Sequence, residues 1–280
     1  MQLLVSVARA HYKAGDFAAA ETLLRDLLAA GDQPAGVFNL LGWCSYKQGK
    51  LKDAIAAMDL AIDREPANAA HYVDLGMMLL SHNRASVALE AAKRALEAAP
   101  DSYPALLLKA VAEAKLNLLA DAAETYRRAA TVKPEAPQPV VARGVVLASA
   151  GRVPEAAAAF EEALRKFPNQ AVVYQEYGKF LAAQGERDRA TGFLERAVAL
   201  DPTAAEARYE LGRLALDAGN PKDALPHLEA AAKRKPQSSK IHFALSRAYR
   251  ELDRPEDAAR ELAAFEKARK AEKNVVEVPQ

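Results

Sequence analysis

Residues 35–68 read AGVFNLLGWCSYKQGKLKDAIAAMDLAIDREPAN, and the rest of the chain repeats this 34-residue pattern. When the sequence is divided into rows of 34 residues starting at Met1, it gives eight complete rows without an insertion. They are 1–34, 35–68, 69–102, 103–136, 137–170, 171–204, 205–238 and 239–272. A period of this length indicates stacked supersecondary units rather than one globular core. Positions within each row are numbered 1 to 34 below.

Three positions hold one kind of residue in most rows. Position 20 is alanine throughout, at Ala20, Ala54, Ala88, Ala122, Ala156, Ala190, Ala224 and Ala258. Position 8 is always small, at Ala8, Gly42, Gly76, Ala110, Gly144, Gly178, Gly212 and Ser246. Position 32 is proline in six rows, at Pro66, Pro100, Pro134, Pro168, Pro202 and Pro236. Such columns, kept in register over the whole chain, indicate true repeats.

The spacing of these columns predicts a helix–turn–helix hairpin in each row. A small residue at position 8 of the first helix would face the alanine at position 20 of the second, so that the two helices pack closely. Glycine at position 15, such as Gly49, ends the first helix in a left-handed conformation. Proline at position 32 ends the second helix. A single hairpin cannot bury its apolar side chains alone, so stacked rows must supply the core.

Rows 2 and 6 resemble the tetratricopeptide repeat in their signature residues. These are Phe38, Leu41, Gly42, Ala54, Met58, Ala61 and Pro66 in row 2, and Tyr174, Gly178, Ala190, Leu194, Ala197 and Pro202 in row 6. The resemblance implies an all-α, right-handed superhelical solenoid of eight repeats, with residues 1–272 as a single domain, first helices on the concave face and second helices on the convex face. The second helix of row 8 is expected to continue through residues 267–273, and residues 273–280 to form a charged, frayed tail.

Composition excludes several classes of protein. The net charge is +1, with 38 basic and 37 acidic residues, so the sequence lacks the basic excess of most nucleic-acid binders. We therefore expect no nucleic-acid partner. Cys44 is the only cysteine, which leaves no internal disulfide. No apolar run reaches the about 20 residues of a membrane span, and the N-terminus shows no signal peptide. The expected compartment is the cytoplasm, with the periplasm as the alternative if the N-terminus has been trimmed.

No catalytic pattern stands out in the sequence. None of the five histidines lies three or four residues from another histidine or from the cysteine, a spacing that many metal sites use. The segment 42–51 lacks the glycine spacing and the hydroxyl residue of a phosphate-binding loop. Cys44 is expected to pack inside the fold. We therefore expect no enzyme, no catalytic residue, no metal site and no cofactor.

The resemblance implies that ligands bind to positions 2, 5, 9 and 12 of the first helices. A spacing of three and four residues places these positions on one side of a helix. In rows 2 to 5 this predicted groove is mostly apolar and comprises Asn39, Trp43, Tyr46, Val73, Met77, Leu80, Leu107, Val111, Val141 and Val145. The polar part comprises Lys179, Tyr209, Arg213, Arg247 and Arg250.

An exposed apolar strip of this kind calls for a partner. The predicted function is therefore a non-enzymatic scaffold that holds a protein or peptide segment, apolar or amphipathic, whose acidic residues meet the arginines. Four alternatives stay open. The strip could pack as core or mediate self-association, and the chain could be a helical-repeat RNA binder or a regulatory arm of a larger complex.

Rows 4 and 5 carry charges where other rows are apolar. Position 7 holds Lys109 and Arg143, and position 11 of row 4 holds Glu113. A lysine and a glutamate four residues apart on a helix can satisfy each other. The alternative is a softened joint, because Pro137 and Pro139 lie at the same row boundary and lack backbone donors.

Overall fold

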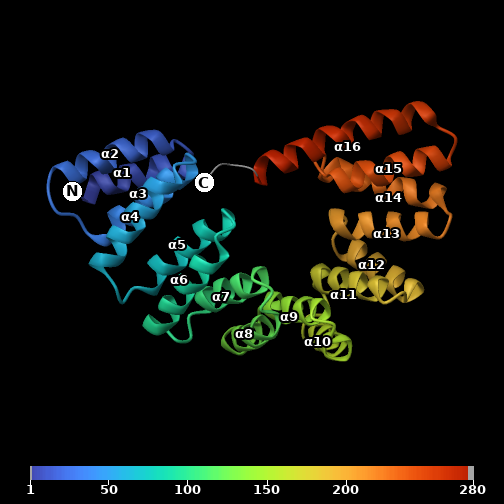
Figure 1. Cartoon of the computed structure of the whole chain (residues 1–280), viewed down its shortest axis with the longest axis horizontal. Coiled ribbons are helices and arrows are strands. Elements are labelled where there is room, and N and C mark those ends of the chain that lie inside the picture. The colour runs from blue at the N-terminus through green and yellow to red at the C-terminus, as the bar shows by residue number, and fades with distance from the viewer. Residues whose placement is uncertain (1, 277–280) are drawn as a thin grey trace. The chain divides into compact units, whose positions relative to one another are not determined.

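The structure, a computed structural model, describes residues 2–276 and the side chains of residues 3–272, and this part of the chain contains helices and no strand (Figure 1). Each row forms two helices. The first helices are α1 (Gln2–Lys13), α3 (Ala35–Lys47), α5 (Ala69–Ser81), α7 (Tyr103–Lys115), α9 (Pro137–Ser149), α11 (Ala171–Ala183), α13 (Ala205–Asp217) and α15 (Ser239–Glu251). The second helices are α2 (Phe17–Ala29), α4 (Leu51–Arg64), α6 (Ala85–Ala98), α8 (Leu119–Val132), α10 (Val153–Lys166), α12 (Arg187–Leu200), α14 (Pro221–Arg234) and α16 (Pro255–Val276).

The helices pack into two compact units, Met1–Gly151 and Arg152–Gln280. The boundary falls in row 5, after α9. In the first unit α1 contacts α3 and α5 contacts α7, and in the second unit α11 contacts α13 and α13 contacts α15. First helices therefore lie side by side within each unit. We call the surface that they form the first-helix face.

The turn inside each hairpin uses a left-handed residue at position 15. This residue is glycine in five rows, for example Gly49 with φ of 77°. The other three rows use Asn83, Asn117 and Asp253, with φ between 55° and 60°. Asparagine and aspartate tolerate this conformation better than other residues that carry a Cβ. The predicted end of the first helix is confirmed in every row.

The two helices of a hairpin approach closely where position 8 is glycine. A Cβ on Gly178 would lie 2.8 Å from Leu194 Cγ and 3.2 Å from the Ala190 carbonyl oxygen. A Cβ on Gly212 would lie 2.5 Å from Leu228 Cγ. The expected contact between positions 8 and 20 is therefore present, and the large residue at position 24 covers it.

Row 3 fills the same space differently. A Cβ on Gly76 would meet Leu108 Cδ2 at 2.3 Å, and Leu108 belongs to the next row. Position 24 of row 3 is Ala92, which is too small to cover Gly76. The volume that row 3 lacks is therefore supplied by α7.

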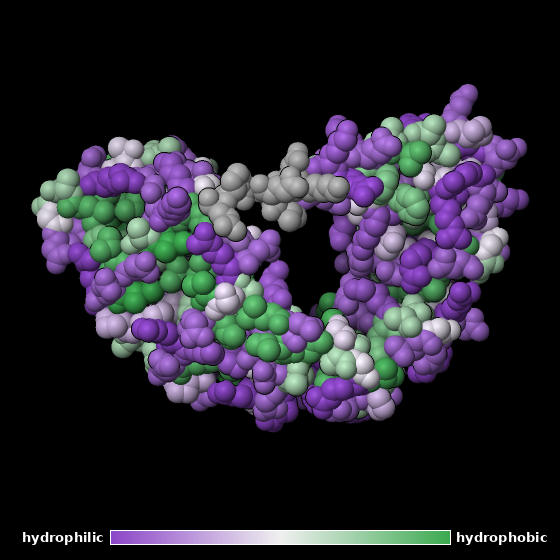
Figure 2. Space-filling view, viewed as in Figure 1, coloured by the Kyte–Doolittle hydropathy of each residue, from purple (hydrophilic) through white to green (hydrophobic). Residues whose placement is uncertain are grey.

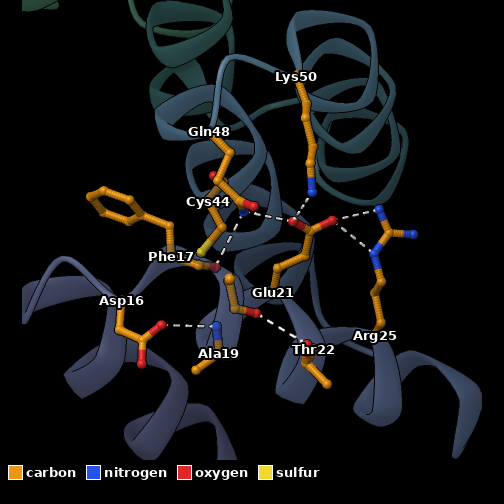
Figure 3. A network of polar contacts seen from close by, with 10 residues as sticks. Asp16, Phe17, Ala19, Glu21, Thr22, Arg25, Cys44, Gln48 and Lys50 are labelled. Carbon is orange, nitrogen blue, oxygen red and sulfur yellow. Dashed lines mark hydrogen bonds and ion pairs between the residues drawn. The ribbon is translucent and has the colours of Figure 1, made fainter.

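A buried carboxylate ties the first row to the second (Figure 3). Glu21, on α2, is 6% exposed. Its Oε1 accepts a hydrogen bond from Arg25 Nη2 at 2.7 Å, and its Oε2 accepts from Gln48 Nε2 at 2.6 Å and from Lys50 Nζ at 2.9 Å. Burial raises the pKa of the Glu21 carboxyl, but the hydrogen bonds from Lys50, Arg25 and Gln48 outweigh burial and lower the pKa to about 2. The network joins α2 to the turn between α3 and α4.

The charges at apolar positions of row 4 satisfy one another. Lys109 Nζ donates to Glu113 Oε1 at 2.5 Å and to Thr125 Oγ1 at 2.9 Å. Thr125 Oγ1 donates in turn to Glu113 Oε2 at 2.8 Å. Glu113 is buried and Lys109 is partly exposed. The predicted lysine–glutamate pair is confirmed, and Thr125 is a third member that the spacing did not indicate.

The last helix is longer than the other second helices. α16 has 22 residues, where α14 has 14. It continues through residues 267–273, as predicted, and Glu272 accepts hydrogen bonds from the Ser239 backbone N–H at 3.1 Å and from its hydroxyl at 2.7 Å. Residues 273–276, expected in a frayed tail, belong to α16, and residues 277–280 of that tail lie outside the described residues.

Glu21→Gln should lower the free energy of unfolding at neutral pH by on the order of 3 kcal/mol, the value that corresponds to a pKa lowered from 4.5 to about 2. The depressed pKa stabilises the fold only while the carboxyl is ionised. The difference between the two proteins is therefore fully present above the ordinary pKa of 4.5 and disappears as the pH falls towards about 2. Urea unfolding at a series of pH values measures it. Glu90→Gln is the control, because the Glu90 side chain is 67% exposed and surface pairs contribute little. Equal losses in both variants would contradict the assignment.

Two helical glycines of row 6 should respond to alanine with opposite sign. Gly178→Ala places a Cβ against Leu194 and should cost about 1–3 kcal/mol. Gly192, on α12, has open space where its Cβ would stand, so Gly192→Ala should gain up to about 1 kcal/mol of helix propensity. Thermal unfolding compares the stabilities of the two variants. A loss of stability in both would show that the open space beside Gly192 does not determine the effect of the added Cβ.

Candidate functional site

The candidate site in the first unit lies on the first-helix face of α3, α5 and α7. Hydrogen bonds between side chains hold α3 against α5. Asn39 Nδ2 donates to Asp74 Oδ2 at 2.7 Å, and Tyr46 Oη donates to Ser81 Oγ at 2.7 Å. The two helices therefore present their side chains as one surface.

Aromatic rings cluster at one end of this surface. The Trp43 and Tyr46 rings meet edge to face with centroids 5.6 Å apart, and the Tyr46 and His82 rings meet at 5.8 Å. Trp43 and Tyr46 are half-buried against the core cluster of Ala54, Met58 and Met78. His82 was missed by the sequence analysis, although its place just after α5, opposite Tyr46 of the previous row, is the signal that could have indicated it.

Exposed apolar side chains continue from this cluster. Met77 on α5 is 44% exposed and Val145 on α9 is 38% exposed. Leu80, Leu107 and Val111 are half-buried. Figure 2 shows hydrophobic side chains gathered over parts of the helices of the first unit. We call the set Trp43, Tyr46, Met77, Leu80, Leu107, Val111 and Val145 the apolar strip.

Two predicted groove residues do not belong to an accessible surface. Val73 is 7% exposed and packs with Tyr72, Ala95 and Ala105, and Val141 is 4% exposed. Both occupy position 5 of their rows. The prediction that these two side chains line an accessible groove is corrected here, because both are buried. Asn39 is half-buried, and its amide nitrogen is committed to Asp74.

The basic candidates of the second unit are mostly paired within the chain. Arg213 bonds Glu210 Oε2 at 2.9 Å and Asp217 Oδ2 at 3.0 Å. Arg247 bonds Asp217 Oδ1 at 2.9 Å and Glu251 Oε1 at 2.8 Å. The carboxylates of Glu210 and Asp217 raise the pKa of Arg213 despite its burial. An acidic ligand segment would compete with these carboxylates, so the expectation that these arginines are available to a ligand is corrected.

The other candidates of the second unit differ in their surroundings. Lys179 Nζ bonds Glu176 Oε2 at 2.8 Å. Tyr209 is half-buried and the Lys240 ammonium lies 4.5 Å from its ring centroid. Arg250 is exposed and lines a surface depression between α15 and α16. The second unit therefore offers a largely self-paired polar surface where the first unit offers an apolar one.

The one cysteine sits in the core beside these helices. Cys44 is 0% exposed and packs with Leu24, Leu41 and Ala57. Burial and the nearby Glu21 carboxylate raise the pKa of its thiol to about 11. Since the thiolate is the reactive form, Cys44 is a packing residue at neutral pH.

Two kinds of site are absent from the described residues. No group of three or more histidine, cysteine, aspartate or glutamate side chains is arranged there to hold a metal ion. No helix of that part combines the length and the apolar character that crossing a bilayer requires.

Solved structures with a similar fold are solenoids of the same kind. Yeast Tom70 superposes with a TM-score of 0.72 at 17% identity over 92% of this chain and 59% of its own. A tetratricopeptide repeat protein from Parabacteroides merdae gives 0.66 at 16% identity over 86% and 97%. Cut9, in the APC/C hetero-tetramer Cut9–Hcn1, gives 0.63 at 17% identity over 93% and 52%. The chain thus spans between half and three-fifths of Cut9 and Tom70, and these likenesses show the fold alone.

Sequence comparison gives the family. None of the curated proteins matches the sequence. The family model described as tetratricopeptide repeat matches residues 8–70, 73–139, 127–171, 141–205, 178–239 and 209–273, which together cover most of the chain. With the hairpins and columns described above, this match shows that the chain belongs to the tetratricopeptide repeat family.

Proposed function

We propose that the chain is a non-enzymatic scaffold that binds a protein or peptide segment on the apolar strip of its first unit. Tetratricopeptide repeats generally mediate protein–protein interaction. The observation that carries the proposal is the exposure of Met77, a large apolar side chain. Met77 lies on α5, between α3, which carries Trp43, and α7, which carries Val111. Apolar area left in water at contiguous positions marks interaction surfaces.

The chemistry of the strip suits an apolar or amphipathic segment. Trp43 is an aromatic anchor already held by Tyr46 and the methionine cluster beneath it, so binding would cost it little conformational entropy. Preformed aromatic anchors dominate interface energies. Met77 adds a thioether side chain that adapts to differently shaped partners.

The charges around the strip do not require an acidic partner. Arg213 and Arg247, which would have met acidic ligand residues, belong to the second unit and are paired there. The proposed partner segment is therefore recognised by its apolar side chains. Any charged residues that it carries would lie on its opposite, polar side.

Substitutions on α5 should separate the binding surface from the core. Met77→Asp should change the free energy of unfolding by no more than about 0.5 kcal/mol, because surface substitutions rarely cost more. Val73→Asp, one helical turn away and 7% exposed, buries an unpaired carboxylate and should cost about 3 kcal/mol or more. Urea unfolding measures both. Equal losses would mean that Met77 is a core residue and that the strip is no binding surface.

Peptides selected from a phage-displayed random library against the wild-type chain should be rich in apolar residues. Their dissociation constants should rise at least about tenfold with Trp43→Ala combined with Met77→Asp, since hot-spot residues carry about 2 kcal/mol or more. Leu60→Asp on α4 is the matched control, because Leu60 and Met77 are both 44% exposed. Fluorescence anisotropy gives the constants. Peptides that bind the double variant as tightly as the wild type would refute the proposed site.

A further inference from the structure

His242, on α15, makes a hydrogen bond with each nitrogen of its ring, and the two bonds reach different segments of the second unit. Nδ1 lies 2.7 Å from Glu261 Oε2 on α16, and Nε2 lies 3.0 Å from the Pro236 carbonyl oxygen in the loop between α14 and α15. The His242 side chain is 12% exposed and that of Glu261 is 16% exposed. His242 thus links the α14–α15 loop, α15 and α16.

These two contacts require a proton on both ring nitrogens. A carbonyl oxygen and a carboxylate oxygen accept hydrogen bonds and cannot donate them. A neutral imidazole has one N–H and one lone pair, so in that form one of the two contacts would bring a lone pair against an oxygen. The imidazolium cation donates to both oxygens. The surroundings of His242 therefore fit the charged form of the ring.

His71 also has a partner at each nitrogen, but its partners fit a neutral ring. Its Nε2 lies 3.1 Å from Glu65 Oε2, and its Nδ1 lies 3.2 Å from Asn39 Nδ2. The Asn39 amide nitrogen is a donor, and its bond to Asp74 Oδ2 agrees with that orientation of the amide. A neutral His71 with its proton on Nε2 satisfies both contacts. Partners on both nitrogens therefore call for a charged histidine only where both are acceptors, as they are at His242.

The bond to the Pro236 carbonyl is a feature of the repeat. Position 4 also donates to the carbonyl oxygen of the proline of the preceding row through Tyr72 at 3.1 Å, Tyr174 at 3.0 Å and Arg208 at 3.1 Å. Phenol and guanidinium groups keep their protons near neutral pH, whereas an imidazole titrates there. Among these four donors, His242 is therefore the one whose charge changes near neutral pH.

Positions 4 and 23 pair a histidine with opposite charges in rows 7 and 8. In row 8 the histidine stands at position 4 and Glu261 at position 23, and in row 7 His227 stands at position 23 and Arg208 at position 4. Burial and the Arg208 guanidinium lower the pKa of His227. Burial also acts to lower the pKa of His242, but the hydrogen bonds to Pro236 and Glu261 and the charge of Glu261 outweigh burial and raise the pKa.

Other ionisable groups in the surrounding segments of α13 to α16 are paired with one another. These pairs are Tyr249 with Glu229, Arg260 with Asp257, and Lys235 and Lys240 with Glu206. Among the described residues, Glu261 is the charged group that acts on the ring of His242. The proton on His242 therefore depends on Glu261 and on the Pro236 carbonyl.

We propose that His242 is a proton-dependent clamp that holds α16 to the α14–α15 loop. In its charged form it makes both hydrogen bonds and an ion pair with Glu261. When the ring releases its proton, the ion pair and one of the two hydrogen bonds are lost. The stabilisation is fully present below the ordinary histidine pKa of 6.5 and is lost as the pH rises through the higher pKa of the folded chain. Row 8 is thus held more firmly at mildly acidic than at alkaline pH.

Titration of the histidine Cε1–H resonances by NMR, on the full chain, tests the protonation. The resonances are assigned by single substitutions. His242 should titrate with a midpoint above 6.5, and His227, the half-buried control of the same unit, with a midpoint below 6.5. Glu261→Gln should lower the midpoint of His242 and leave that of His227 unchanged. A His242 midpoint at or below 6.5, or one that Glu261→Gln does not move, would overturn the proposal.

Hydrogen exchange tests whether the same proton controls the clamp. His242→Tyr is the comparison, because Tyr72 and Tyr174 bond the proline carbonyl from the same position and do not titrate near neutral pH. In the wild type, amide protection over residues 236–246 and in α16, relative to the exchange rate of an unfolded chain at the same pH, should fall as the pH rises through the His242 midpoint.

In His242→Tyr the same protection should stay constant with pH. An equal fall in both proteins would mean that the titration of His242 does not loosen row 8, and the clamp would be refuted. The apolar strip belongs to the first unit, so neither experiment bears on the proposed function.

Discussion

Within each unit, the structure depends on the close approach of the two helices of a hairpin. At Gly178 and Gly212 even one added carbon would stand within 3.0 Å of a leucine at position 24, and that leucine is completely buried. Packed interiors have no slack to absorb such a change. The distance and register of the pair are therefore fixed, and the opposite side of the first helix is fixed with them. Positions 9 and 12 are turned outward because position 8 is turned inward.

The exception in row 3 shows that this constraint acts on volume and not on residue identity. Ala92 leaves space at position 24, and Leu108 of the next row enters it until a Cβ on Gly76 would meet it at 2.3 Å. Repeats are often treated as units that contact their neighbours through a separate interface. In rows 3 and 4 one side chain serves both the hairpin and the interface. These two rows therefore share their core, and a substitution at either position should be felt in both.

The columns of small residues and prolines were sufficient to predict the hairpins, because the contacts that they make recur with the repeat. The candidate site was predicted less completely. Val73 and Met77 lie one turn apart on α5, and both fit the ligand stripe, yet α6 and α7 cover the first and leave the second open. Arg213 and Arg247 looked available because their shared partner Asp217 stands at position 13, outside the stripe. Whether a residue at a given row position is exposed or paired depends on the size and charge of side chains in neighbouring rows. The 34-residue period alone does not predict these.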